Sequence, residues 1–525
     1  MRRDDAAPIG SAYANYTLGV LVLVYVFNFL DRQIISILAE RIKADLGVSD
    51  AQIGFLYGTA FAVFYAVFGI PLGRLADVWD RRRLIAIGLA FWSVATALSG
   101  MARGFGQLAA ARIAVGIGEA SASPAAFSLL SDLFPAARRA TVLAVYSSGI
   151  YLGAGLGLGI GGLVVERWDA AYPGAAAPFG LAGWQVAFLV VGLPGLLLAV
   201  WVATLREPVR GAMDGLPAPV EPHPWRAFGR ELRAVVPPLT VLNLVLVRAG
   251  GRVIATNLVA AGVIAVAAGL LTWAVGTPAQ WIALGIGLYA AVSWAQALAL
   301  RDRPAATLIL QTPALRSAGV GFSFLAFTGY GIGFWLAPFL VRVHGASEAQ
   351  VGLLLGGTSA VAGWLGVTLG GLLADRWQRT RPDGRLLVGL VNALVPLPIA
   401  VWMLWTDAVW LVYVLAFPLS LATSLWIGPG ASTVQDLVLP RMRAVASAAY
   451  LLVVTFVGLA LGPYTIGRLS VALGDLRLAM ACALVANVCA AACLWRAMRR
   501  IEHDQRSLLE RAREAGEPGL DPRPP

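Results

Sequence analysis

Fourteen long apolar runs constrain this chain more than any other feature of its sequence. Each run holds about 20 residues, enough for a helix to cross a bilayer core of roughly 30 Å. Their apolar character is continuous rather than alternating, which argues against membrane-spanning strands. We therefore predict an all-α membrane protein with fourteen transmembrane helices. The runs are 17–38, 54–75, 84–102, 107–131, 142–165, 183–205, 253–275, 280–300, 316–341, 351–373, 386–405, 409–432, 444–466 and 478–497.

The composition agrees with a membrane location, and the charge distribution predicts its orientation. Hydrophobic residues make up 58% of the 525 residues and charged residues only 13%, about half the charged share of a soluble domain. The formal net charge is +11, but the arginine clusters follow every second run, whereas the alternate loops carry few. This asymmetry is the positive-inside pattern, so we expect both termini in the cytoplasm. The basic balance therefore points to anionic membrane lipids as partners and not to nucleic acid.

Two stretches of the chain repeat each other at a fixed distance of 298 positions. The hexapeptide S-D-A-Q-I-G at 49–54 is answered by S-E-A-Q-V-G at 347–352, and the loop 73–83 by 371–381. A single offset across both stretches indicates a duplicated structural unit. Many secondary transporters consist of such repeats, with the substrate site where the two halves meet. The sequence therefore predicts a membrane transporter built from two copies.

The repeat divides the chain into five segments. Two six-helix bundles form the copies, and two apolar runs between them have no partner in the repeat. In the linker, Trp225, Phe228 and Leu232 share one helical face, which is typical of a helix on the membrane surface and suits either a structural clamp or a lipid sensor. We expect the charged tail to form a short solvated helix. The segments are 1–205 (first bundle), 206–252 (cytoplasmic linker with an amphipathic helix), 253–303 (two inserted helices), 304–500 (second bundle) and 501–525 (cytoplasmic tail).

Four charged residues lie inside apolar runs of the first bundle: Asp31 and Arg32 in the first run, Arg112 and Glu119 in the fourth. A charge at the centre of a membrane helix costs about 2.5–3.5 kcal/mol on insertion scales. Arg112 and Glu119 are two helical turns apart and share a face. We predict that the four meet around one cavity and form a site. An inert network of ion pairs is the alternative.

The energy source for transport is predicted by elimination. The only lysine, Lys43, lacks the glycine pattern of a phosphate-binding loop, so ATP hydrolysis is not expected. The three histidines lie in loops, the linker or the tail, so a carboxylate must carry any coupled proton. Asp31 or Glu119 could serve, because burial and a neighbouring arginine act on the proton affinity of a carboxyl in opposite senses. We expect no cofactor, no metal site and no enzymatic activity.

Two further groups of residues are candidates for function. The loop 73–83 places an aspartate at a helix end beside several arginines, an arrangement that could open and close as a gate. Its candidate gating residues are Gly73, Asp77, Arg81 and Arg82, with Asp375 and Arg379 in the second copy. Candidate residues of the substrate site are Asn28, Tyr57, Tyr65, Tyr146 and Tyr151, although packing is the stronger expectation for any single tyrosine. Glycines at four-residue spacing in the fifth run predict close helix packing.

These motifs resemble the major facilitator superfamily over nearly the whole chain. The loop 73–83 is similar to that family's loop between its second and third helices, but departs from it at Val78 and Asp80. The segment N-F-L-D-R-Q at 28–33, the pair Arg112 and Glu119, and Y-S-S-G-I-Y at 146–151 resemble the Spinster branch. That resemblance implies export of lysolipids or sphingoid phosphates coupled to protons. It also implies that Asp31 is the proton-sensitive acid, with Arg32, Arg112 and Glu119 around it.

Together these patterns predict a proton-coupled secondary transporter that works by alternating access. Its expected partners are protons, membrane lipids and a small, amphipathic or lipid-like substrate, and we expect a monomer. The bias toward Ala, Gly and Arg favours a bacterial inner membrane. Two alternatives stay open. The inserted pair of runs resembles the fourteen-span multidrug–proton antiporters, and a membrane sensor or scaffold that does not transport would belong to another class.

Overall fold

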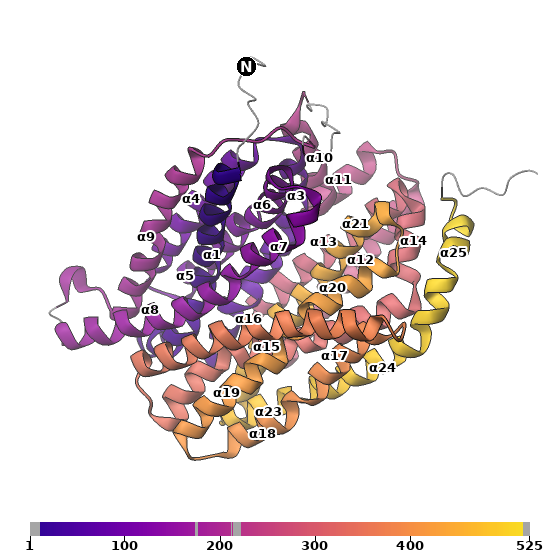
Figure 1. Cartoon of the computed structure of the whole chain (residues 1–525). Coiled ribbons are helices and arrows are strands. Elements are labelled where there is room, and N and C mark those ends of the chain that lie inside the picture. Colours follow the sequence, from indigo (N-terminus) through magenta and orange to yellow (C-terminus); the bar gives the residue numbers. More distant parts are fainter. Residues whose placement is uncertain (1–10, 174–176, 212, 214–221, 518–525) are drawn as a thin grey trace, which may run out of the picture. The chain divides into compact units, whose positions relative to one another are not determined.

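The computed structural model describes residues 11–173, 177–211, 213 and 222–517, and these are all-helical, with no strand among them (Figure 1). Fourteen of the helical segments are long and apolar enough to cross a membrane, which agrees with the predicted number. The predicted segments at 1–10, 214–221 and 518–525 lie outside the described residues.

The helices fall into three groups along the chain. The first repeat contains α1 (Ser11–Leu46), α2 (Asp50–Tyr57), α3 (Thr59–Val78), α4 (Arg81–Ser99), α5 (Phe105–Glu119), α6 (Ala122–Leu133), α7 (Ala136–Ser147), α8 (Gly149–Ala171) and α9 (Gly183–Ala203). The middle of the chain contains α10 (Pro224–Val235), α11 (Leu239–Leu246), α12 (Gly251–Val275) and α13 (Pro278–Arg301). The second repeat contains α14 (Arg303–Gln311), α15 (Pro313–His344), α16 (Glu348–Gln378), α17 (Gly384–Leu394), α18 (Pro396–Trp405), α19 (Val409–Ser424), α20 (Ile427–Asp436), α21 (Arg443–Val453), η6 (Val454–Ala460), α22 (Leu461–Leu473), α23 (Leu476–Ala483), α24 (Val485–Arg506) and α25 (Leu508–Glu514).

Contacts between Cα atoms divide the chain into two compact units that do not follow the repeats. Unit 1 comprises 1–48, 67–232 and 340–360, and unit 2 comprises 49–66, 233–339 and 361–525. Each unit therefore takes one short segment from the other repeat. The predicted division into bundles, linker and tail remains a prediction about sequence segments.

In unit 1, α8 packs along α1, and α4 packs against α5 and α9. The glycines of α8 make the first contact possible: a Cβ atom on Gly153 would lie 2.3 Å from the carbonyl oxygen of Val26, and one on Gly157 2.8 Å from that of Leu30. A larger side chain could not fit at either position without moving the α1 backbone. The close packing that the glycine spacing predicts is therefore present.

In unit 2, four residues of the hexapeptide 49–54 have a structural role: Ser49, Asp50, Gln52 and Gly54. Ser49 caps α2, since its side chain accepts the N–H of Gln52 while the Gln52 side chain accepts the N–H of Ser49, a capping box. Asp50 accepts a hydrogen bond of 2.7 Å from the Ser470 hydroxyl on α22. A Cβ atom on Gly54 would lie only 2.5 Å from the carbonyl oxygen of Pro463, so a glycine is needed where α2 crosses α22.

The second hexapeptide, 347–352, repeats these roles inside unit 1. The Ser347 hydroxyl accepts the N–H of Gln350 at 3.2 Å, at the start of α16. Glu348 accepts a hydrogen bond of 2.7 Å from Nε of Arg41. A Cβ atom on Gly352 would lie 2.3 Å from the carbonyl oxygen of Leu158 on α8. The repeated motif is thus a cap, an anchoring carboxylate and a glycine crossing, and it joins the two repeats in both units.

The C-terminal segment is part of the packed structure of unit 2. Asp504 on α24 is only 3% exposed and accepts the N–H of Ala314 at 2.7 Å, which caps the first turn of α15. Farther along, Glu517 and Asp302 both form ion pairs with Arg441. The described part of the tail is helical, as expected, in the end of α24 and in α25. It is not simply solvated, because these carboxylates and their partners anchor it.

Candidate functional site

Two helices of unit 1 carry the four charges that the sequence places inside the membrane. Asp31 and Arg32 lie in the middle of α1, and Arg112 and Glu119 lie on α5. All four are buried, with exposed fractions between 0% and 6%. The structure brings the four together, while a cavity between them stays a prediction. We call Asp31, Arg32, Arg112 and Glu119 the buried charge cluster.

Arg32 and Glu119 form the ion pair of this cluster. Nη2 of Arg32 lies 2.7 Å from Oε2 of Glu119, and the same nitrogen donates a hydrogen bond of 3.2 Å to Oδ1 of Asn28, one turn earlier on α1. The Arg32 guanidinium also lies over the ring of Phe29, 4.5 Å from its centroid. Glu119 therefore has a fixed counter-ion inside the protein, and the hydrogen bond between two charged groups is a strong one.

Asp31 has a different environment from Glu119. Its Oδ2 accepts a hydrogen bond of 3.1 Å from the hydroxyl of Thr96 on α4, and its backbone carbonyl accepts one of 3.3 Å from Arg112. Among the described residues, no arginine or lysine forms an ion pair with its carboxylate, and Oδ1 accepts no hydrogen bond of normal geometry. Asp31 is therefore a fully buried acid without a fixed counter-ion within ion-pair distance.

The candidate tyrosines all take part in aromatic packing or lie nearby. Tyr146 is completely buried and stacks on Tyr25, with ring centroids 4.4 Å apart, while Tyr151 is half-buried on α8. Tyr57 and Tyr65 belong to unit 2, where Tyr57 packs on Phe334 and Tyr65 stacks on Phe61. Only Tyr146 and Tyr151 thus share a contact unit with the buried charge cluster.

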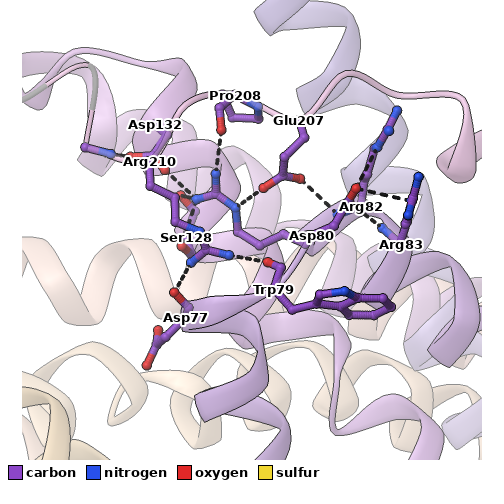
Figure 2. Close-up of polar contacts among 12 residues, drawn as sticks. Asp77, Trp79, Asp80, Arg82, Arg83, Ser128, Asp132, Glu207, Pro208 and Arg210 are labelled. Carbon is purple, nitrogen blue, oxygen red and sulfur yellow. Dashed lines mark hydrogen bonds and ion pairs between the residues drawn. The ribbon is translucent and has the colours of Figure 1, made fainter. Parts of the chain in front are cut away.

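The predicted gating loop of the first repeat is held by a dense polar network (Figure 2). Its centre is Arg81, whose side chain is completely buried although it begins α4 at a helix end. The guanidinium donates to Oε1 of Glu207 at 2.6 Å, to the carbonyl oxygen of Pro208 at 3.0 Å, and to the Ser128 carbonyl at 3.0 Å. It also forms an ion pair with Asp132 on α6.

The other residues of this loop are tied to the same network. Asp80, where the resembling family usually has glycine, caps α4 by accepting the N–H of Arg83 at 3.0 Å. Arg82 donates its backbone N–H to Glu207 at 3.2 Å. The Arg210 guanidinium donates to the backbone carbonyls of Asp77 and Trp79, and burial lowers the pKa of Arg210 below its usual value. The segment after α9 therefore fastens the loop (Figure 2).

The second repeat places a different arginine in the role of Arg81. Arg385 at the start of α17 donates to the carbonyl of Ser432 at 3.3 Å and pairs with Asp436. These partners lie 47 and 51 positions after the arginine, the same separations as in the first repeat. The fixed offset pairs Arg81 with Arg379, and this pairing is wrong. In the second repeat this arginine comes six positions later than the fixed offset predicts, so the structural counterpart of Arg81 is Arg385.

The two predicted gating loops also differ in the charged neighbours of their aspartates. In the first repeat, Asp77 on α3 lies 4.0 Å from Arg74. A Cβ atom on Gly73 would make an ordinary van der Waals contact with Pro124 at 3.9 Å. Asp375 lies on α16 and acts electrostatically on Arg385. Among the described residues, no three His, Cys, Asp or Glu side chains are grouped closely enough to hold a metal ion.

Sequence reasoning missed Thr96, Asp132 and Glu207. A single hydroxyl in an apolar helix gives no recognisable signal, so Thr96 could be found only from the structure. Asp132 did have a signal: the pattern S-x3-D at 128–132 recurs at 432–436, 304 positions later. A search at the one offset of 298 could not detect it. Glu207 lies two residues after the sixth apolar run, where a single carboxylate in a polar linker gives no sign of a contact with Arg81.

Comparisons with known proteins show which family the sequence and fold of this chain match. Residues 21–463 match the model described as the Major Facilitator Superfamily. An MFS-type efflux pump of Mycolicibacterium smegmatis is 30% identical over 97% of this chain and 98% of its own length. Protein spinster homolog 1 of Xenopus tropicalis is 25% identical over 88% of this chain and 74% of its own length. The likeness extends to solved structures. A crystal structure of a bacterial homologue of the human lysosomal transporter Spinster, inward-facing and unoccupied, is 25% identical, covers 94% of this chain and 99% of that chain, and has a TM-score of 0.71.

Proposed function

This chain belongs to the major facilitator superfamily and resembles its Spinster branch. It is a multi-pass membrane transporter rather than an enzyme. On that premise we propose that it is a proton-coupled secondary transporter of an amphipathic small molecule, with Asp31 as the coupling acid. The observation that carries this proposal is the contrast between the two buried carboxylates. Glu119 has Arg32 at 2.7 Å, whereas the Asp31 carboxylate accepts a hydrogen bond from Thr96 at 3.1 Å and has Arg112 and Trp92 near it without an ion pair among the described residues.

This contrast separates two roles that the sequence left open between Asp31 and Glu119. A coupling acid has to gain and lose a proton during the cycle, and a carboxylate fixed to an arginine resists protonation because the ion pair would be lost. Glu119 is therefore assigned the role of holding Arg32 in place. Asp31 is free to change its charge without breaking an ion pair among the described residues.

The cations beside Asp31 provide a way to couple the proton to substrate. Arg112 reaches the backbone carbonyl of Asp31, and Arg32 is the next residue on α1. A substrate with an anionic or polar head group would compete for these guanidinium groups. Ionised Asp31 and the bound head group would then use the same cations alternately, so release of a proton and binding of the substrate affect each other. Asn28, Tyr146 and Tyr151 complete the proposed site in unit 1.

Alternating access needs a gate, and the network around Arg81 is the proposed cytoplasmic one. Arg81 and Arg82 contact the segment after α9, and Arg210 fastens the backbone at Asp77. Exchange of these partners between two arrangements would be a two-state switch of the kind that domain rocking requires. The positive-inside pattern supports a cytoplasmic position for this network and both termini, and the bias toward Ala, Gly and Arg supports a bacterial inner membrane.

The substrate class is proposed from the relatives. Spinster proteins appear among the similar sequences and structures, which supports a lipid-like or amphipathic substrate. The second candidate is a multidrug–proton antiporter. The efflux pump of M. smegmatis, which is similar over 97% of this chain, favours it, and so do the two inserted helices. Both candidates use the same buried charge cluster and differ only in what the site accepts.

The deciding experiment uses the purified chain in liposomes that enclose a pH-sensitive dye. Lysophospholipids, sphingoid phosphates and cationic drugs are added in turn to wild type, Asp31→Asn and the control Asp407→Asn, whose carboxylate is 97% exposed. The proposal expects substrate-dependent proton movement in wild type and the control, and its loss in Asp31→Asn. The compound that moves protons identifies the class.

Three results would contradict the proposal. Equal proton movement in wild type and Asp31→Asn would show that Asp31 is not the coupling acid. Substrate uptake without proton movement in all three proteins would indicate facilitated diffusion. If no compound moved across a broad panel while binding was retained, the non-transporting sensor would become the better interpretation.

A further inference from the structure

The inserted helices α12 and α13 form a hairpin that holds itself together. Asn257 on α12 is completely buried and donates to Ser293 at 3.1 Å and to Gln296 at 2.6 Å, both on α13. Tyr289 donates to the same asparagine at 2.7 Å and accepts a hydrogen bond from Thr240 on α11. Buried amides and hydroxyls of this kind join helices inside a membrane. The hairpin is thus a preformed element that can act as one piece.

One face of α13 contacts both repeats at a single position. A Cβ atom on Gly287 would lie 2.8 Å from Val63 on α3 and 2.9 Å from Phe456 on η6. Val63 belongs to the first repeat and Phe456 to the second, and all three residues are in unit 2. The hairpin therefore lies over the line along which the two repeats meet. We call the contact of α2 and the start of α3 with η6 and α22 the seam.

The tip of the hairpin, at residues 275–281, is attached to α22. The hydroxyl groups of Thr277 and Tyr464 form a hydrogen bond, and the ring of Trp281 packs edge-on against Tyr464, with centroids 5.6 Å apart. Arg468, one turn farther along α22, donates to the carbonyl of Val275 at 3.1 Å, at the end of α12. The hairpin is thus held at its tip by α22, and at Gly287 it contacts both α3 and η6.

The two repeats pack closely against each other at the seam. The backbone of η6 has π-helical geometry, and the Thr59 hydroxyl donates to the carbonyl of Ala460 at 2.9 Å. A Cβ atom on Gly58 would lie 2.6 Å from the carbonyl of Leu459. A π-helical turn leaves backbone groups that need partners from outside the helix. The first repeat supplies one such partner, the Thr59 hydroxyl. This hydrogen bond has to break when α2 and α22 separate.

We propose that the inserted hairpin is a brace across the seam, which stabilises the state in which α2 and α22 are in contact. It does so by binding Val63 and Phe456 at once through Gly287, while Thr277, Trp281 and Arg468 hold its tip on α22. The brace depends on the proposed function only in that alternating access must separate the seam. It shifts the balance between states and takes no part in binding the substrate or the proton.

The test measures seam opening directly and needs no substrate. Cys482, Cys489 and Cys493 are replaced by alanine, and a single thiol is introduced by Ser470→Cys, at the residue whose hydroxyl meets Asp50 across the seam. The protein is reconstituted in lipid nanodiscs, so that a water-soluble maleimide reaches both membrane faces. Gly287→Leu is then compared with Gly262→Leu on α12, where a Cβ atom has no neighbour within 4 Å.

We expect Gly287→Leu to raise the labelling rate of the introduced thiol about 5- to 30-fold, the effect of losing a well-packed contact. Gly262→Leu should leave the rate unchanged. Equal rates in the two variants, or slower labelling in Gly287→Leu, would overturn the proposal. If Gly287→Leu does not fold to a monodisperse protein, Phe456→Ala removes the same contact from the other side and carries the same expectation. Because labelling involves neither protons nor substrate, the brace can fail while the transport proposal stands, and the reverse.

Discussion

Nη2 of Arg32 lies 2.7 Å from Oε2 of Glu119, and their side chains are only 8% and 0% exposed. The two residues are 87 positions apart and come from α1 and α5, so this pair fixes one helix against the other inside unit 1. Its energetic value lies less in the attraction itself than in the cost of leaving either charge buried alone.

Removal of one member of this pair should therefore be strongly destabilising. We expect Glu119→Gln to lower the free energy of unfolding by about 3–5 kcal/mol, because Arg32 would remain buried without its anion. Asp31→Asn should cost clearly less, since no ion pair is lost. Thermal unfolding of the detergent-solubilised variants, followed by intrinsic fluorescence, measures both. Equal losses in the two variants would contradict the distinction between the carboxylates.

The two structurally equivalent arginines of the repeats should differ in importance. Arg81 is fully buried and bonded to four different residues, whereas the side chain of Arg385 is 20% exposed and is bonded to two. Arg81→Ala should thus lower the free energy of unfolding by about 3 kcal/mol or more, and Arg385→Ala by about 1–2 kcal/mol. Arg379→Ala is the matched control and should have little effect. A larger loss at Arg379 than at Arg385 would restore the pairing at the fixed offset.

The glycine of the repeated hexapeptide should tolerate no side chain. Gly54→Ala places a methyl group 2.5 Å from the carbonyl oxygen of Pro463, and backbone atoms cannot rotate away. We expect a loss of about 1–3 kcal/mol in stability, and a similar loss for Gly352→Ala in the other unit. Gly69→Ala is the control, because a Cβ atom there has no neighbour within 4 Å. It should be neutral or slightly stabilising, since alanine favours a helix over glycine.

The anchor of the C-terminal segment should respond to acid. Hydrogen bonds from Arg441 hold the pKa of Asp302 below its ordinary value. A lowered pKa in the folded state contributes stability that is present above the unfolded pKa of about 4 and is lost as the pH falls through the folded value. The melting temperature of wild type should exceed that of Asp302→Asn by a constant amount above about pH 5, and the difference should shrink below about pH 4. A difference that does not change with pH would contradict this assignment.

The fold could be predicted from the sequence because its main determinants are local. A run of about 20 apolar residues has few alternatives to a membrane helix, and a fixed offset between motifs reveals duplication. The buried charge cluster was also predictable, since its charges are costly inside a membrane and have to find each other there. Neither inference requires knowledge of how distant helices pack.

The remaining features depend on contacts that leave little trace in the sequence. Thr96 resembles any other small residue of an apolar helix until α4 is placed beside Asp31. The role of Arg385 was hidden because this arginine comes six positions later than the fixed offset predicts, which shifts the true offset from 298 to 304. The function of Gly54 becomes visible only when the carbonyl of Pro463 is found against it.

The exchange of short segments between the contact units has a consequence for biosynthesis. Residues 49–66 complete unit 2, and residues 340–360 complete unit 1, so no single cut in the polypeptide separates the two. The ribosome makes residues 49–66 long before the helices that they pack against, and the hydroxyl of Thr59 meets its carbonyl partner at Ala460 only after another 401 residues. Unit 1 can therefore be completed only after residue 360 has been made, and unit 2 only when nearly the entire chain has entered the membrane.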